Sequence, residues 1–443
     1  MLKYLSLAFL LLLATAQAAH AQDPAPLTLQ QCVEYAQKNS LRIQQANISL
    51  QQNEIAERQA YWARYPSVSA NFQHGFNLGR SVDLTTYQFV NQLMQATSLS
   101  IGANIPIYSG GQLRYSLQRS QLETKASQQD IAQAKLDIAL TVTQAYLSAL
   151  LAEESLKLLK EQVKITEEQL QRTVKLISAG TLAENARFDL DAQIARDEQS
   201  IATAENAVDL AYLNLKIALN YPLQQPLTVQ SIDSSQFAAA TANAPKAATL
   251  NAETIYQEAL NRQPNLQAAR LRQSSALLAV RIAEGALQPT VGAYINWASN
   301  YSSTGSYFTG DTLMVMQTLS GELNGAPFEL NIPQAVPERA TSGFFRQLRD
   351  NNRASMGISA QIPIFNGFQS RLRIEQARLS VRLNEMTTQQ IQIQLQSDIQ
   401  RAVLDLKGSE KRLAAAQRSL AATTTAVANT QKRFENGLVN AFE

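Results

Sequence analysis

Few side chains in the sequence could carry out acid–base, nucleophilic or metal-ion chemistry. The chain has two histidines, His20 and His74, and one cysteine, Cys32, so it cannot assemble a zinc-spaced Cys/His set or an internal disulfide. It contains neither a phosphate-binding loop nor a dinucleotide fingerprint. Carboxylates lie near basic residues, as Glu153 lies near Lys157, which is typical of a solvated helix face. We therefore expect no catalytic residue, no cofactor and no metal.

The first 21 residues are typical of an export signal. Lys3 precedes an apolar run from Leu5 to Ala14, and Ala19-His20-Ala21 has the small residues of a cleavage site. A membrane anchor is the alternative, but no segment reaches the ~18 consecutive apolar residues of a membrane helix. A lipid anchor on Cys32 is disfavoured because two glutamines precede it. We expect a signal peptide at 1–21 and, from the net charge of +2, no nucleic-acid partner.

The rest of the sequence contains one unit written twice. Pro66 matches Pro289 at an offset of 223 residues. Pro106 matches Pro363 at an offset of 257, so the second copy carries an insertion of 34 residues, expected to be a long loop at 302–353. The second copy stops where the first continues, so its final helix is expected to be truncated. The expected domains are repeat 1 at 22–221, a linker at 222–250 and repeat 2 at 251–443.

Each copy contains two segments in which apolar and polar residues alternate with a period of two, as in a β-strand with one apolar face. Each is about ten residues long, which suits a tilted strand that crosses a membrane. The opposite faces carry Gly, Ser, Asn and Gln without charge, which suits a water-filled lumen. The alternative is a soluble sheet with one wet face. The predicted strands are 66–78, 97–108, 289–301 and 354–365.

Long helices are predicted on either side of these strands. Residues 28–64 favour one helix, which Pro66 ends. No proline interrupts 112–178, and about 67 residues of helix would be on the order of 100 Å long. The second copy repeats this pattern at 369–436. Apolar residues recur at coiled-coil spacing, so a coiled-coil rod without a barrel is the alternative.

A helix–helix turn is predicted after residue 178. Gly180 suits the left-handed position that ends a helix, and Thr181 suits the N-cap of the next one. That second helix is expected to run to Tyr221, where Pro222 ends it.

Four membrane strands per chain cannot close around a lumen, for which about eight are needed even when the interior is filled. Unpaired strand edges are also too costly in lipid, so several chains must share one barrel. The expected fold class is an α+β membrane protein with internal duplication. It combines a long α-helical coiled-coil tunnel with a transmembrane β-barrel shared between protomers, to which each chain gives four strands. Such a tube suits export across an outer membrane.

The duplicated unit and its strand-to-helix junctions resemble the TolC-like outer-membrane efflux protein family. The junction residues that carry the resemblance are Pro106, Gly110 and Gly111 in the first copy, and Pro363 and Gly367 in the second. The resemblance implies a homotrimer with a twelve-stranded barrel and a twelve-helix tunnel, set in outer-membrane lipid of a Gram-negative bacterium and extending into the periplasm. It also implies docking onto a periplasmic adaptor protein and an inner-membrane pump. The implied function is the passive exit duct of a tripartite efflux or type I secretion system.

The helix turns are the points that the tube presents to the inner membrane, so they are the candidate adaptor-docking tips. Their residues are Gly180, Thr181, Leu182, Gly437, Leu438 and Val439, and the alternative is an ordinary helix turn without a partner. The resemblance implies acids at the tunnel aperture, and the candidates are Asp189, Asp191 and Glu443. The family's aromatic before the turn is Phe434 here instead of tyrosine, and Val439 replaces an arginine, so the latch of the aperture differs from the family pattern. The alternative function is an outer-membrane receptor or scaffold that uses the loop at 302–353.

Overall fold

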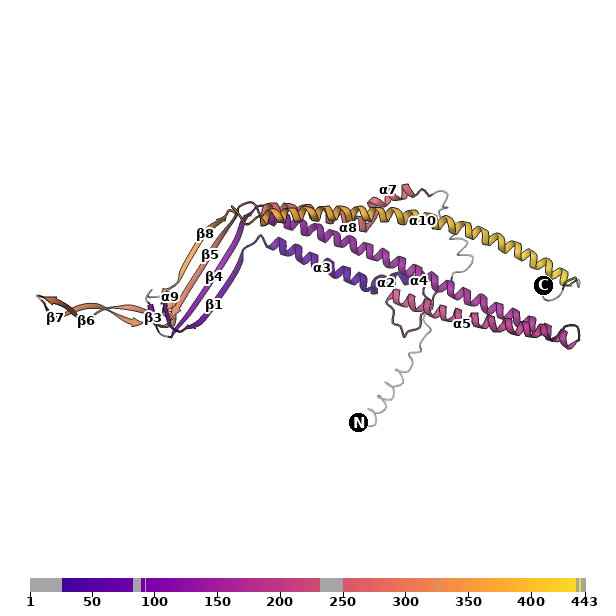
Figure 1. Ribbon diagram of the computed structural model, residues 1–443, viewed down its shortest axis with the longest axis horizontal. Coiled ribbons are helices and arrows are strands. Elements are labelled where there is room, and N and C mark those ends of the chain that lie inside the picture. Colours follow the sequence, from indigo (N-terminus) through magenta and orange to yellow (C-terminus); the bar gives the residue numbers. More distant parts are fainter. Residues whose placement is uncertain are drawn as a thin grey trace, which may run out of the picture. The chain divides into compact units, whose positions relative to one another are not determined.

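The computed structural model describes residues 26–82, 89–91, 93–231, 250–323, 325–435 and 438–439. The chain forms two compact units, whose elements are labelled in Figure 1. The helical unit comprises Met1–Ile55, Gln121–Ser274 and Arg382–Glu443, and the sheet unit comprises Ala56–Ser120 and Ser275–Val381. Each unit takes segments from both halves of the chain, so the units differ from the two predicted repeats. The division into repeats stays a prediction, and the predicted signal peptide lies outside the described residues.

Helices form most of the described chain, and two of them are very long. Helices α4 and α10 have 67 residues each, so the two proline-free segments fold as predicted. No helix among the described residues is long and apolar enough to cross a membrane. The helices are α2 (Leu29–Asn39), α3 (Leu41–Trp62), α4 (Gln112–Ser178), α5 (Asn185–Leu219), α7 (Ala252–Arg262), α8 (Pro264–Gly285), α9 (Phe344–Asp350) and α10 (Gln369–Glu435).

The single helix predicted at 28–64 is wrong, because the chain breaks at Ser40 into α2 and α3. Ser40 is buried and has an extended backbone (φ −62°, ψ 125°). Its neighbour Asn39 uses its side-chain amide to donate to the Tyr35 carbonyl at 2.9 Å, while the Asn39 carbonyl accepts from the Asn220 side chain at 3.0 Å. Asn and Ser compete for backbone hydrogen bonds in this way, which explains why they favour helix ends over helix interiors.

The core of the helical unit joins α2, α3, α4 and α5 to the segment after α5. Its fully buried side chains include Cys32, Val142 and Leu215. Tyr146 of α4 is also buried, and its hydroxyl donates to the Gln230 carbonyl at 2.8 Å. The start of the predicted linker therefore lies against the helices, with Leu227 and Val229 as members of the same core.

The sheet unit contains one four-stranded antiparallel sheet with the strand order β1-β4-β5-β8. Figure 1 shows these strands side by side, with β1 and β8 at the two edges. A short ribbon of β2 and β3 lies within the β1–β4 connection. The strands are β1 (Ser67–Asn77), β2 (Arg80–Val82), β3 (Phe89–Asn91), β4 (Met94–Ser109), β5 (Thr290–Ser302) and β8 (Arg353–Gln361).

The four sheet strands lie where the sequence predicts them, but two differ in length. Strand β4 begins at Met94 instead of residue 97. The last strand was predicted to reach residue 365, but β8 ends at Gln361. Gln361 pairs with Thr290, the first residue of β5, so β8 has no partner residue beyond this point. The first copy differs because β4 continues past Pro106, with a register shift before Tyr108, and reaches Ser109 opposite Thr290.

The long loop predicted at 302–353 is wrong. This segment forms a two-stranded antiparallel ribbon of β6 (Ser306–Leu323) and β7 (Ala326–Thr341), followed by α9. Leu323 pairs with Ala326, so the connection between the strands is two residues long, and Gly325 within it has a φ of +83°. Asn-Gly in a two-residue connection is a strong hairpin signal, and the segments around it are rich in β-forming residues.

Candidate functional site

One face of the four-stranded sheet carries an apolar band over the half nearer the helices, and His74, Thr97 and Ser299 interrupt it towards the other end. Each row of the band crosses the paired strands, as Ala103, Ile295 and Met356 do. Its larger side chains are exposed, with fractional exposures of 70% for Phe72, 61% for Ile295 and 83% for Met356. A soluble sheet would cover such a face. An uncovered band of this kind suits contact with lipid.

The opposite face of the sheet is polar. The row of Ser69, Gly102, Asn296 and Ser355 is representative. The sequence predicted that this face carries no charge, and one residue departs from that prediction. Arg353, the first residue of β8, pairs with Ala298 and lies in this polar register.

The sheet has two edges that pair with no other strand in the described part of the chain. They are β1 and β8, of 11 and 9 residues. Each edge leaves every second backbone N–H and C=O pair without a strand partner. In lipid each unpaired group costs several kcal/mol, so an open sheet of this kind needs further strands.

The junction between β4 and α4 depends on three glycines. Gly110 and Gly111 have φ values of +61° and +76°. A Cβ on Gly110 would lie 2.3 Å from the Gly285 carbonyl oxygen, and a Cβ on Gly285 would lie 2.5 Å from the Gly110 carbonyl oxygen. The end of α8 and the start of α4 therefore approach so closely that only glycine fits at both positions.

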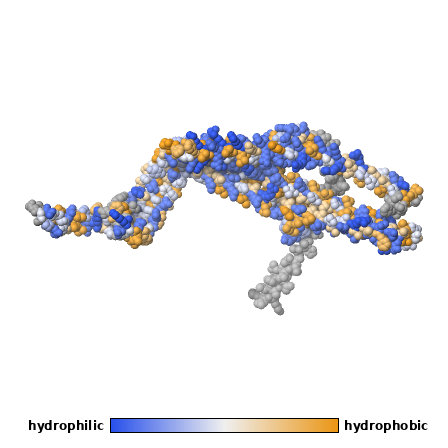
Figure 2. Space-filling view, in the orientation of Figure 1, coloured by the Kyte–Doolittle hydropathy of each residue, from blue (hydrophilic) through white to orange (hydrophobic). Residues whose placement is uncertain are grey.

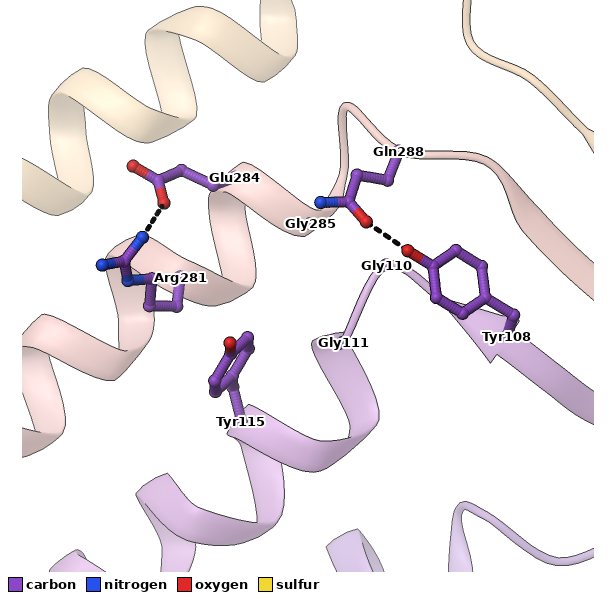
Figure 3. A pocket seen from close by; sticks show the side chains of 8 residues that line it. All are labelled: Tyr108, Gly110, Gly111, Tyr115, Arg281, Glu284, Gly285 and Gln288. Atoms are coloured by element: carbon purple, nitrogen blue, oxygen red, sulfur yellow. Dashed lines mark hydrogen bonds and ion pairs between the residues drawn. The ribbon is translucent and has the colours of Figure 1, made fainter.

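Polar contacts surround this glycine contact, as Figure 3 shows. The Tyr108 hydroxyl donates to the Gln288 side-chain oxygen. Arg281 and Glu284 form an ion pair at 3.2 Å, and Arg378 of α10 approaches the other Glu284 oxygen at 3.6 Å. Tyr108, Tyr115, Arg281, Glu284 and Gln288 line a pocket at the junction together with the three glycines. Its side chains come from β4, α4, α8 and the residues after α8.

The second-copy junction has the same backbone with different side chains. Gly367 and Phe368 have φ values of +63° and +62°, as Gly110 and Gly111 do in the first copy. Phe368 is thus a non-glycine residue in a left-handed conformation. The centroid of its ring lies 5.6 Å from that of the Phe365 ring. Sequence reasoning missed Phe368, although the offset of 257 residues places it opposite Gly111. Figure 2 shows apolar surface where strands and helices join, and exposed Ile364 and Phe365 belong to this junction.

The turn between α4 and α5 closes as a Schellman motif around Gly180. The Gly180 N–H donates to the Ile177 carbonyl at 2.9 Å, and the Thr181 N–H donates to the Leu176 carbonyl at 3.0 Å. Gly180 has a φ of +76°, which confirms the predicted cap position. The prediction that Thr181 is the N-cap of the next helix is wrong, because α5 begins at Asn185. The Thr181 hydroxyl instead donates to the Leu176 carbonyl of the preceding helix at 2.8 Å. Leu182 follows with its side chain exposed.

The turn after α10 has the same closing bond. The Leu438 N–H donates to the Arg433 carbonyl at 2.8 Å, a five-residue step that matches the one from Thr181 to Leu176. Leu438 is 69% exposed and Val439 is partly exposed. Gly437 lies outside the described residues.

The candidate aperture acids are only partly described. Asp191 of α5 pairs with Arg187 at 3.5 Å, and Asp189 is exposed on the same helix. Glu443 lies outside the described residues. The assignment of these acids to an aperture stays a prediction, as does the assignment of the turns to adaptor docking.

Buried titratable groups in the helical unit serve packing. Burial raises the pKa of the Cys32 thiol to about 11. Burial and the hydrogen bond to Glu153 raise the pKa of Tyr212, whose hydroxyl donates to the Glu153 carboxylate at 2.5 Å. No group of three or more His, Cys, Asp or Glu side chains in the described residues could hold a metal ion.

The sequence matches a known family over most of its length. The model of the outer membrane efflux protein family matches residues 32–221 and 255–443. None of the curated proteins is significantly similar to this chain in sequence.

The structure is similar to solved structures of outer-membrane channels. The outer membrane protein VceC from Vibrio cholerae has a TM-score of 0.70 and 14% sequence identity, over 94% of this chain and 87% of VceC. The CmeC outer membrane channel of Campylobacter jejuni has a TM-score of 0.69 and 15% identity, over 93% of this chain and 78% of CmeC. The open-state MtrE channel of Neisseria gonorrhoeae has a TM-score of 0.62 and 16% identity, over 92% and 80%. At these identities the likeness shows the fold, which confirms the predicted fold class.

Proposed function

The chain belongs to the outer membrane efflux protein family, and on this premise we propose that it is one protomer of a homotrimeric exit duct in the outer membrane of a Gram-negative bacterium. Family and fold are those of channels rather than enzymes. The duct would conduct substrate passively from the periplasm to the exterior, and the long helices would extend into the periplasm as a tunnel.

The observation that carries this proposal is the open four-stranded sheet with an apolar band and two unpaired edges. Lipid tolerates the band but not the edges. Three copies would supply twelve strands, enough to enclose a water-filled lumen. Pairing β8 of one protomer with β1 of the next would satisfy both edges at once. The polar face would then line the lumen, because the apolar band faces outward.

The energy for transport must come from partners, because the sequence contains no nucleotide-binding motif. We propose that a periplasmic adaptor protein docks at the turns after α4 and α10 and connects the duct to an inner-membrane pump. Exposed Leu182 and Leu438 give each turn an apolar contact point for such a partner. The polar face, uncharged apart from Arg353, does not separate small-molecule efflux from protein secretion.

The oligomeric mass in detergent, measured together with conductance in planar bilayers, tests the duct. We expect the mass of three chains and discrete conductance steps. A monomeric mass without conductance would contradict the shared barrel.

The docking turns can be tested separately from the barrel. Aspartate at Leu182 and Leu438 should abolish co-purification of the adaptor and export, and leave the trimeric mass unchanged, because both residues are exposed at turns. Gln199→Asp is the matched control, since Gln199 is an exposed polar residue within α5, away from the turn. Normal adaptor binding by the double variant would refute docking at these turns.

A second candidate function is a receptor or scaffold that uses the β6–β7 ribbon. One face of the ribbon is apolar and exposed, with Leu313, Leu319 and Leu330 each about half exposed. Such a face suits contact with another macromolecule. If the protein is purely a receptor, removing the ribbon should abolish ligand binding and should not affect efflux. If the protein is an exit duct, it binds no ligand through the ribbon, and removing the whole protein should abolish export.

A further inference from the structure

Arg353 is the one charged side chain in the polar register of the four-stranded sheet, as far as the structure describes it. The register of the sheet places it in the row Asn71, Ser100, Ala298, Arg353. The rows nearer the helix junction contain Ser69, Asn104, Asn296, Gly357 and similar uncharged residues. Arg353 begins β8 directly after α9, so it lies towards the sheet end that is opposite the helix junctions.

No carboxylate among the described residues forms an ion pair with Arg353. The nearest acid in sequence, Asp350, is already paired with Arg346 at 3.5 Å and Arg349 at 3.0 Å. Arg349 lowers the pKa of Asp350 most, and Arg346 lowers it further. Asp350 is therefore ionised, and the two guanidinium groups offset its charge. Arg353 is exposed, and its partner in the same row is the small residue Ala298.

We infer that Arg353 makes the outer part of the conduit selective for anions. This inference rests on the proposed function, because only a closed barrel would bring three copies of Arg353 into one ring around the lumen. Rings of arginine attract anions and repel cations in pores. Neighbouring β1 strands would bring no compensating acid, since their polar positions Ser67, Ser69, Asn71 and Gln73 are uncharged. The favoured substrates would be anionic or neutral solutes.

The local potential beside Arg353 can be measured with a single cysteine. Ser355 lies two residues further along β8 on the same polar face and is exposed. The native Cys32 is fully buried and burial raises its pKa to about 11, so it contributes little background reaction. The probes are an anionic and a cationic methanethiosulfonate of similar size, applied to full-length Ser355→Cys protein in lipid vesicles.

We expect the anionic reagent to react faster relative to the cationic one than it does with free cysteine. Adding Arg353→Gln should lower this rate ratio, Arg353→Lys should retain it, and Arg353→Glu should invert it. A ratio that is the same with Arg353→Gln as with the native arginine would overturn the inference. Cysteine at Ile358, on the apolar face, is the control and should react slowly with both reagents. Ser355→Cys that reacts no faster than Ile358→Cys would instead contradict the water-filled lumen, and with it the exit duct.

Discussion

At the residue scale, the junctions from strand to helix depend on backbone conformations that few residues adopt. Two consecutive left-handed residues lie between strand and helix in each copy. The first copy uses two glycines, whereas the second uses Gly367 and Phe368. A left-handed residue with a side chain costs on the order of 1–2 kcal/mol, so the second junction stores strain that the first avoids.

Replacing Gly110 with alanine should destabilise the protein far more than the same change at Gly367. Both positions have a left-handed φ, but a Cβ on Gly110 would meet the Gly285 carbonyl at 2.3 Å, while a Cβ on Gly367 has nothing within 4 Å. Gly367→Ala should therefore cost only the backbone strain of about 1–2 kcal/mol. Thermal unfolding of both variants measures the difference, and equal melting temperatures would contradict the close contact.

Alkaline pH should destabilise the helical unit through Cys32. Its pKa rises from 9.0 to about 11 on folding, so the folded protein holds this proton more tightly than the unfolded chain. The resulting stabilisation is fully present below pH 9 and is lost as the pH rises towards 11. Denaturant unfolding between pH 8 and 11 should show the decline, with a shallower slope for Cys32→Ala. An unchanged slope would mean that the buried thiol does not titrate in this range.

At the element scale, the sheet strands separate two environments by the alternation of their side chains. Ile295 and Asn296 are neighbours on β5, and their side chains belong to opposite faces. The central strand therefore offers a matched pair of positions, one on the apolar band and one on the polar face.

Lysine at position 295 should prevent membrane assembly, while lysine at position 296 should be tolerated. A charge on the lipid-facing side near the bilayer midplane costs about 2–4 kcal/mol, whereas a charge in a water-filled lumen keeps its hydration. The yield of heat-resistant oligomer from outer membranes is the readout. Equal yields for Ile295→Lys and Asn296→Lys would show that the apolar band does not face lipid.

Removing the β6–β7 ribbon should leave the sheet intact. The Ser342 N–H donates to the Gly305 carbonyl at 2.9 Å, so the two ends of a deletion of 306–341 already lie side by side. We expect the shortened protein to assemble and conduct as before. Failure to assemble would assign the ribbon a structural role between protomers. Deletion of 80–91, which holds β2 and β3, provides a control for shortening a connection of the same sheet.

The elements that follow a simple period could be predicted from the sequence, and those that depend on local backbone chemistry could not. The bounds of α4 follow from 67 residues without proline, and the strands follow from strict alternation. The break at Ser40 could not be predicted because the helix propensity of the surrounding residues outweighs that of one serine. The break depends on a distant residue, since the Asn220 side chain donates to the Asn39 carbonyl at the end of α2. The length of the insertion favours a loop, whereas the ribbon depends on the local chemistry of Asn-Gly between β-forming segments. The place of Arg353 on the polar face could not be predicted, because the predicted strand begins at residue 354. It became clear only from the register of β8, which begins at Arg353.

At the scale of the whole molecule, the two compact units cut across the two copies of the repeat. Four helices, α3, α4, α8 and α10, contribute residues to both units, and each unit takes residues from both copies. The four-stranded sheet needs both copies, because β1 and β4 come from the first and β5 and β8 from the second. The buried core of the helical unit comes from the first copy and the segment after α5.

Shortening one long helix should disrupt assembly more than shortening both. Helices α4 and α10 have 67 residues each, and their far ends carry turns with the same closing bond. Deleting seven residues from α10 alone would misalign the two turns, whereas deleting seven from both helices preserves their match and the coiled-coil period. Adaptor co-purification should be lost in the single deletion and restored in the paired one. Adaptor binding by the single deletion would show that the turns act independently.

The equal lengths of α4 and α10 also restrict how a gene of this kind can change over generations. A single insertion or deletion in one half would be selected against until a compensating event of the same size occurs in the other half. Changes in the length of the long helices should therefore be rare. They should occur in pairs, or arise by recombination that copies one half of the gene onto the other. The ribbon is under no such restriction, because its adjoining ends allow one local event to lengthen, shorten or replace it.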